Sequence, residues 1–232
     1  MKVLVSPINE EEAIAAYKGG ADIIDVKNPK EGSLGANFPW VIRSVKEAIG
    51  SKKPISATIG DFNYKPGTAS LAALGAAVAG AQYVKVGLFD VQTEDQALEM
   101  LTNINRAVKD FDPSKKVVAS GYSDYKRINS ISPFLLPAIG AKAGVDVVMV
   151  DTGIKDGRST FEFMSEEELI RFTSSIREFG LESALAGTLK FEDLPVLKRI
   201  QPDIIGIRGM VCGGDRTACI RQELVERLKG MI

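Results

Sequence analysis

One strand-like pattern recurs four times along the chain, at intervals of about 60 residues, and it limits the fold more than any other feature. In each copy a short turn leads to Asp or Gln and then to a run in which apolar residues take every second position. The copies occupy residues 19–27, 79–87, 143–151 and 201–208. This interval is about twice the 30 residues of one βαβ step, so a further strand is predicted between each pair of copies.

Short apolar or β-rich segments occur where those further strands are expected. They cover residues 2–5, 54–58, 117–119 and 182–186. Between the strands the apolar residues follow a helical period, over residues 10–18, 40–48, 68–79, 94–109, 134–143, 166–178, 191–199 and 217–229. Eight β/α units without a long structureless insertion predict an α/β protein with a closed (β/α)₈ barrel, the TIM-barrel class, in a single domain of residues 1–232. An open doubly wound sheet shows a similar alternation and is the structural alternative.

The repeat also predicts which side chains point into the barrel, because strand side chains alternate between two faces. One face is apolar in every copy, with Ile24 and Val26 in the first, and should lie beneath the helices. The other face carries the pairs Asp25/Lys27, Lys85/Gly87, Met149/Asp151 and Gly206/Arg208. We therefore expect charged groups inside the barrel at the carboxyl ends of the strands, where the active sites of such barrels lie.

Lys27 and Lys85 are the strongest candidates for chemistry. Burying an ammonium group is costly unless it is paired, so two inward lysines indicate catalysis or ligand binding rather than a solvated surface. Asp25 and Asp151 are candidate counter-ions or catalytic carboxylates, and Lys155 follows in the next loop. Two cations in a partly dry pocket lower at least one amine pKa, and a neutral amine can attack a carbonyl to form an iminium. The pattern favours a Schiff-base aldolase or lyase.

The last two βα loops indicate the charge of the substrate. Loops after the seventh and eighth strands often hold phosphate in this fold. Glycines let backbone N–H groups approach an anion, and arginine adds two donors, although Gly-rich turns also occur for conformational reasons. The candidate phosphate ligands are Gly187, Thr188, Arg208, Gly209, Gly213 and Gly214.

Composition narrows the classes of partner and chemistry. A net charge of −1 offers no footprint for nucleic acid or an anionic membrane, and the apolar runs are far shorter than the roughly 20 residues that span a bilayer. The chain has no histidine, and Cys212 and Cys219 are not spaced as a redox or zinc pair. We expect no bound metal and, since the first residues do not form an export signal, a cytoplasmic enzyme.

Residues 25–40 carry a long and specific resemblance to a known family. The run DVKNPKEGSLGANFPW closely resembles the (5-formylfuran-3-yl)methyl phosphate synthases of methanofuran biosynthesis, also called 4-(hydroxymethyl)-2-furancarboxaldehyde-phosphate synthases. The resemblance extends over the whole chain, including residues 64–70, 83–88, 151–157 and 184–187.

The resemblance implies a lyase that condenses two molecules of glyceraldehyde 3-phosphate to a phosphorylated furan aldehyde, with loss of one phosphate and two waters. It implies that Lys27 is the Schiff-base nucleophile and Lys85 the proton acceptor and donor, with Asp25, Asp151 and Lys155 assisting. The implied partner is a phosphorylated triose, with no cofactor, nucleic acid or membrane, and a homo-oligomer is compatible with the sequence. The residues alone lead to Schiff-base chemistry on a phosphorylated carbonyl; the furan product and the pathway come only from the resemblance.

Two other functions fit the same residues. A class I aldolase of another phosphorylated sugar would also use Lys27, but its aldol product lacks the near-ultraviolet absorption of a furan aldehyde. A non-catalytic barrel that binds a phosphorylated metabolite and regulates a partner would form no adduct that borohydride could trap. A triosephosphate isomerase mechanism is excluded by the missing histidine.

Overall fold

Eight parallel strands close into a barrel in the computed structural model, which describes residues 1–232. The strands are β1 (Lys2–Val5), β2 (Ile23–Val26), β3 (Ile55–Phe62), β4 (Tyr83–Leu88), β5 (Lys116–Tyr122), β6 (Val147–Asp151), β7 (Glu182–Leu185) and β8 (Ile204–Ile207). Each strand pairs with the next in the chain, and β8 pairs with β1 to close the ring. The predicted (β/α)₈ barrel is therefore confirmed, and the open sheet is excluded.

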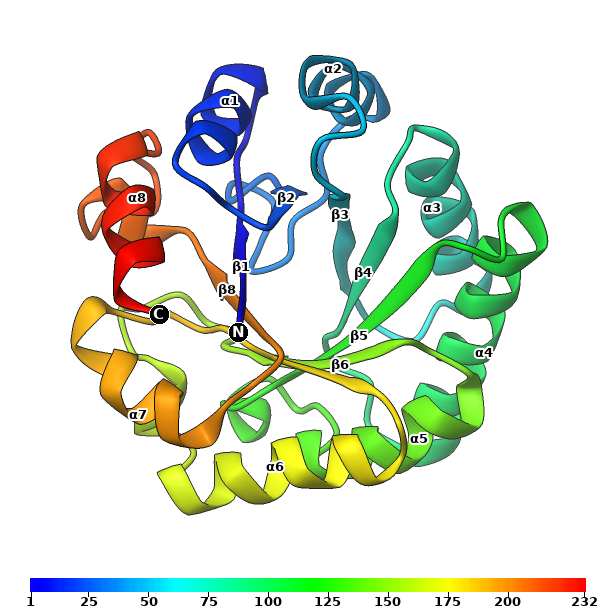
Figure 1. Ribbon diagram of the computed structural model, residues 1–232. Coiled ribbons are helices and arrows are strands. Elements are labelled where there is room, and N and C mark those ends of the chain that lie inside the picture. Colours follow the sequence, from blue (N-terminus) through cyan, green and yellow to red (C-terminus); the bar gives the residue numbers. More distant parts are fainter.

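An α-helix follows each strand and lies on the outside of the barrel, as Figure 1 shows. The helices are α1 (Glu10–Lys18), α2 (Pro39–Ile49), α3 (Pro66–Val78), α4 (Glu94–Phe111), α5 (Leu136–Ala143), α6 (Glu166–Glu178), α7 (Leu194–Ile200) and α8 (Gln222–Met231). Several begin at side-chain caps that satisfy free N–H groups: Asn9 accepts from the Glu12 N–H at 2.9 Å, and Ser165 and Glu168 form a capping box at α6. No helix is long and apolar enough to cross a membrane.

The core has two parts that match the predicted alternation. The larger cluster, of 54 buried residues, lies between the strands and the helices and includes Ile24 and Val26. The smaller cluster, of nine residues, fills the interior of the barrel and includes Ile23 and Met149. Burial of apolar area at about 25 cal/mol per Å² stabilises both, and the outer cluster supplies most of it. These apolar side chains do not fill the barrel interior at the carboxyl ends of the strands, and polar side chains occupy that part instead.

Several element boundaries differ from the prediction, and two differences shape the site. Strands β3 and β5 extend to Phe62 and Tyr122, further than the expected ends at residues 58 and 119, and so reach the mouth of the barrel. Helix α8 begins at Gln222 rather than Thr217. The residues before it form a loop. Thr217 donates two hydrogen bonds to the Asp215 side chain (2.8 and 2.7 Å), and the Arg208 guanidinium donates to two backbone carbonyl oxygens of the loop (2.6 and 3.1 Å).

Candidate active site

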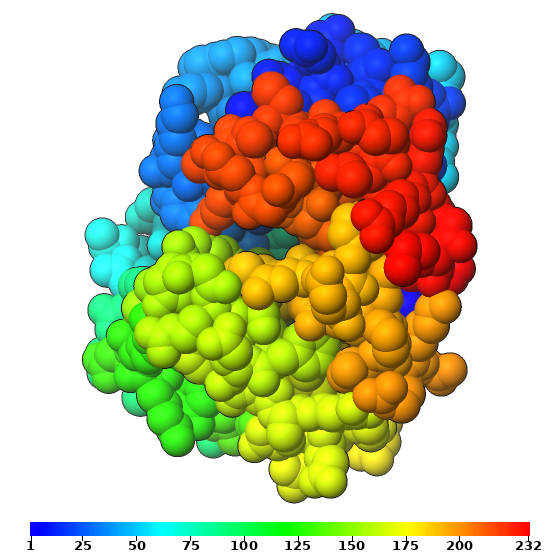
Figure 2. Space-filling model, turned by 90° about the vertical axis from the view of Figure 1, so that its left-hand side faces the viewer, coloured from blue at the N-terminus to red at the C-terminus, as the bar shows by residue number.

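A pocket of about 220 Å³ opens at the carboxyl ends of the strands. In Figure 2 the surface is hollowed between the loop after β8, in orange, and the segment after β6, in yellow-green. Nine of the predicted site residues line the pocket: Lys27, Lys85, Asp151, Lys155, Gly187, Thr188, Arg208, Gly209 and Gly214. Two do not. Asp25 lies beneath the wall, fully buried, and Gly213 lies outside the lining at the end of a short 3₁₀ turn with φ 76°.

Lys27 ends the β2 repeat and brings a buried amine to the pocket. Its side chain is 7% exposed, and its Nζ makes no hydrogen bond or ion pair with the protein. Burial, with the charges of Lys85 and Lys155, lowers the pKa of Lys27 to about 7, against the opposing effects of Asp151 and Asp25. A large fraction of this amine is therefore neutral at physiological pH and free to react.

Lys85 on β4 differs from Lys27 in having a buried partner. Its Nζ donates to Asp25 Oδ2 at 2.7 Å, and the two side chains are 1% and 0% exposed. Asp25 also accepts from the hydroxyls of Ser6 (2.8 Å) and Ser56 (2.6 Å). Burial alone would raise the pKa of the Asp25 carboxyl, but the charges of Lys85 and Lys27 and these hydrogen bonds hold it below its ordinary value. Asp25 therefore acts on the pocket through Lys85.

Asp151 and Lys155 form a second charged pair across the pocket, at the end of β6. Lys155 Nζ donates to Asp151 Oδ1 and to the Thr152 hydroxyl (2.8 Å). The Thr152 N–H also donates to Asp151 Oδ1, at 2.7 Å. Burial favours a raised pKa for Asp151, but Lys155, Lys27 and these hydrogen bonds lower it. Asp151 Oδ2 accepts no hydrogen bond from the protein and remains free to take a proton.

The loop after β7 offers backbone donors to the pocket. The N–H groups of Gly187, Thr188 and Leu189 have no acceptor in the protein, and all three residues line the pocket. Thr188 has φ 53°, a conformation that is costly for a β-branched residue and is typical of functional sites. Gly187 has φ 96°, and a Cβ there would collide with Thr160 Oγ1. The arrangement suits an anion.

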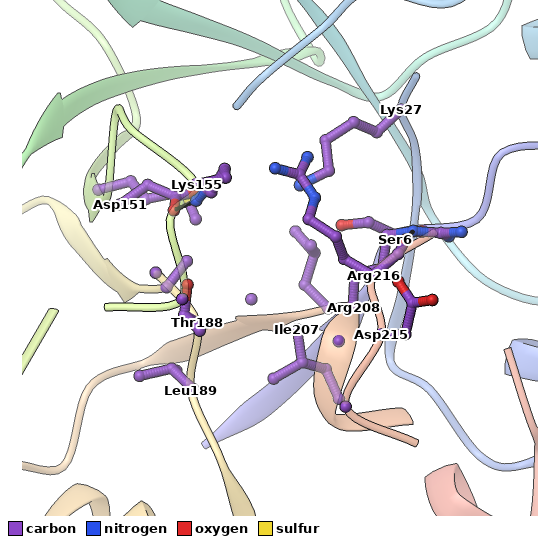
Figure 3. Close-up of a pocket in the computed structure, with 18 of the residues that line it drawn as sticks. Ser6, Lys27, Asp151, Lys155, Thr188, Leu189, Ile207, Arg208, Asp215 and Arg216 are labelled. Carbon is purple, nitrogen blue, oxygen red and sulfur yellow. Dashed lines mark hydrogen bonds and ion pairs between the residues drawn. The ribbon is translucent and has the colours of Figure 1, made fainter. Parts of the chain in front are cut away.

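Two arginines after β8 lie in contrasting environments. All five N–H donors of Arg208 are used within the protein, by Glu12 and by the carbonyl oxygens of Ser6, Arg216 and Ala218. Its guanidinium has no donor left for the phosphate that the sequence led us to expect. Arg216, which sequence analysis did not include among the site residues, points into the pocket (Figure 3) and makes one hydrogen bond, to the Gly32 carbonyl at 3.1 Å.

Asp61, which is half-buried, and Tyr122, which is fully buried, form a pair at the mouth that the sequence did not reveal, because the prediction ended both strands too early. Tyr122 donates its hydroxyl to Asp61 Oδ1. Asp61 also accepts from the Leu34 N–H (3.2 and 3.0 Å), which anchors the loop of residues 28–37. Burial and the charge of Asp151 raise the pKa of Asp61. Burial and Asp61 likewise raise the pKa of Tyr122 well above 10.

The loop of residues 28–37 covers part of the mouth. Besides the contact with Asp61, its Ser33 hydroxyl donates to the Thr152 carbonyl (2.7 Å) and Arg216 donates to Gly32. Ser33 and Leu34 are buried. The loop is thus tied to strand β3 and to the segments that follow β6 and β8, as a lid would be. No group of three or more His, Cys, Asp or Glu side chains is placed to hold a metal ion.

Comparison with known proteins relates this chain to one family. A family model described as 4-HFC-P synthase matches residues 3–229. The chain is 79% identical over 228 residues to (5-formylfuran-3-yl)methyl phosphate synthase of Methanosarcina acetivorans, covering 98% of this chain and 97% of the relative. The corresponding enzyme of Methanosarcina barkeri is 78% identical over the same shares. A crystal structure of 3-hexulose-6-phosphate synthase aligns with a TM-score of 0.68 over 100% of both chains at 19% identity, which shows the shared fold alone.

Proposed function

Because the chain belongs to the (5-formylfuran-3-yl)methyl phosphate synthase family, we propose that it condenses two molecules of glyceraldehyde 3-phosphate into that furan phosphate through a Schiff base on Lys27. One phosphoric acid and two waters leave, so atoms balance without an oxidant or reductant. We place the reaction in methanofuran biosynthesis in the cytoplasm, as a lyase that needs neither metal nor cofactor.

The Lys27 amine carries the proposal. It is buried at the pocket, has no protein partner and has a pKa of about 7. In the first step its Nζ bonds to the aldehyde carbon, the carbonyl oxygen takes up one proton from the amine and one from an acid, and water leaves to give the iminium. The Lys155 ammonium, held by Asp151, is an acid in the same pocket that can supply that proton.

The later steps move protons on carbon. An iminium acidifies the adjacent C–H, and a base must accept that proton and return one elsewhere. Lys85, aligned by Asp25, and the free oxygen of Asp151 are the groups of the pocket suited to this.

A substrate phosphate belongs at the loop after β7. Gly187, Thr188 and Leu189 line the pocket with N–H groups that have no acceptor in the protein, and Gly209 and Gly214 bring further backbone to its wall. Backbone donors of this kind bind phosphate without a counter-ion of their own. We therefore assign this cradle to the phosphate that remains in the product, with the Arg208 guanidinium supporting the loop rather than touching the anion.

The test combines trapping with product analysis. The protein is incubated with glyceraldehyde 3-phosphate, reduced with borohydride and mapped by peptide mass spectrometry, while the furan is followed by near-ultraviolet absorption. An adduct on Lys27 with furan formation supports the proposal. An adduct without furan indicates a class I aldolase, and the absence of both excludes Schiff-base chemistry on this substrate.

A further inference from the structure

Condensing two trioses requires the pocket to hold two phosphate groups, each carrying about −1.5 to −2 charges at pH 7. The cradle after β7 accounts for one. The second needs a cation that the protein has not already neutralised, since a paired cation has lost much of its attraction for another anion. The need for such a cation rests on the proposed function, and the cations that line the pocket are the candidates.

Five cationic side chains line the pocket, and four are unsuited to a second phosphate. Lys85 is paired with Asp25, Lys155 with Asp151 and Arg208 with Glu12 (2.7 Å). Lys27 must be neutral to act as the nucleophile. The fifth side chain is Arg216, which makes no ion pair and, unlike Lys27, need not be neutral for the reaction.

Arg216 is placed and equipped for the task. We propose that its guanidinium binds the phosphate of the second triose, opposite the cradle that holds the first. Figure 3 shows its side chain entering the pocket from the side that faces Thr188 and Leu189. Only one of its donors is engaged, by the Gly32 carbonyl at 3.1 Å, which leaves the paired donors that match phosphate oxygens.

The contact with Gly32 adds a consequence for the lid. Gly32 belongs to the loop of residues 28–37, so the side chain that binds the second phosphate also holds this loop. The lid would then cover a phosphate bound at Arg216, and the covered pocket would exclude water from the reacting carbons. Loss of Arg216 therefore removes both a charge and a loop contact, and the experiment must separate the two.

The experiment uses Arg216→Gln, Arg216→Lys and, as the matched loop control, Ser33→Ala. The control removes the hydrogen bond from Ser33 to the Thr152 carbonyl, another tie of the same loop, without changing charge. For each protein, the borohydride-trapped adduct of one triose on Lys27 is quantified beside the rates of furan formation and phosphate release. Thermal unfolding verifies that each variant is folded.

We expect Arg216→Gln to keep the single-triose adduct within about 3-fold of wild type and to lose about 10²-fold in furan formation and phosphate release. Arg216→Lys should recover part of that loss, because the charge returns without the paired donors. Ser33→Ala should retain both adduct and furan within about 3-fold.

Three results would overturn the assignment. Unchanged furan formation in Arg216→Gln would show that the guanidinium binds no substrate, and parallel loss of adduct and furan would place it on the first triose. The same defect in Ser33→Ala would assign the effect to the loop. A wild-type protein that forms neither adduct nor furan would instead reject the proposed function, and this assignment with it.

Discussion

Lysine side chains at the two ends of the barrel differ in exposure and in pairing. At the amino ends of the strands, Lys2 and Lys116 both donate to Glu182, and Lys116 also lies 5.4 Å from the ring centre of Tyr83. These side chains remain partly exposed and paired. At the carboxyl ends, Lys27 is 7% exposed and its amine has no partner.

This difference between the two ends shows where the protein gives up stability for function. Pairing at the amino end stabilises the charged forms: burial opposes ionisation of Glu182, but hydrogen bonds from Lys116 and Lys2 lower its pKa. The carboxyl end instead holds a lysine with a depressed pKa and a threonine at positive φ, Thr188. Such features persist only where the surrounding structure enforces them, and they concentrate at functional sites.

Replacing Lys27 should give the largest effect. Lys27→Met removes the amine but keeps an unbranched apolar side chain, so we expect furan formation to fall at least about 10³-fold and the borohydride adduct to vanish. Lys2→Met at the other end is the control and should leave both unchanged. Residual adduct in Lys27→Met would assign the nucleophile to another lysine.

The same variant should be more stable than wild type at neutral pH. The folded-state pKa of Lys27 is about 7 and its ordinary value is 10.5, so burying the amine costs most below pH 7 and nothing above pH 10.5. Lys27→Met should thus raise Tm by roughly 10 °C at pH 7, with the gain shrinking as the pH approaches 10.5. A gain that is independent of pH would contradict the depressed pKa.

Breaking the buried pair beneath the pocket should come next in size. Asp25→Asn leaves the Lys85 ammonium without a counter-charge at 1% exposure, and removing one partner of such a pair costs about 3–5 kcal/mol. Urea unfolding at pH 7 measures the loss. A loss below about 1 kcal/mol would mean that the pair is solvated.

The pH dependence of trapping tests the Lys27 amine directly. The neutral form is the nucleophile, so the rate of adduct formation should rise about tenfold per pH unit below pH 7 and level off above it. The charge of Asp151 raises the pKa of Lys27, so Asp151→Asn should move the midpoint below 7. A midpoint near 10 in the wild type would show an ordinary, solvated lysine.

The pair of Asp61 and Tyr122 at the mouth should matter less. Tyr122→Phe removes a donor to the half-buried Asp61 carboxylate and should cost about 1–2 kcal/mol in unfolding free energy. Tyr64, which donates to Glu99 on the exposed surface, supplies the matched control, and Tyr64→Phe should leave stability unchanged. Equal effects in the two variants would deny any special role to the Asp61 pair.

How far the sequence could predict this site depended on whether a residue lay in the repeat. Lys27, Lys85 and Asp151 all occupy inward positions of the repeat, so strand alternation predicted that they face the barrel interior. Arg216 and Asp61 lie outside the repeat. Asp61 was hidden because β3 continues past its apolar run. Arg216 was hidden because it lies in a loop before α8, where Thr217 donates to the Asp215 side chain. Loop conformation, set by such local contacts, leaves no periodic signal.

The same limit explains Arg208. The sequence places Arg208 at an inward position after β8 but cannot show that its guanidinium forms an ion pair with Glu12 on α1. Side-chain pairing between distant elements decides which of several similar cations is free, and that emerges only when the barrel closes.

The smallest expected effect comes from the amino end. Glu182→Gln leaves Lys2 and Lys116 without their shared carboxylate, but both ammonium groups can turn to solvent, since their side chains are 50% and 35% exposed. We expect a loss below about 1 kcal/mol in urea unfolding, normal furan formation and an adduct midpoint that stays near pH 7. A shifted midpoint would mean that charges at this end reach the pocket, and the two ends of the barrel could then no longer be treated as separate.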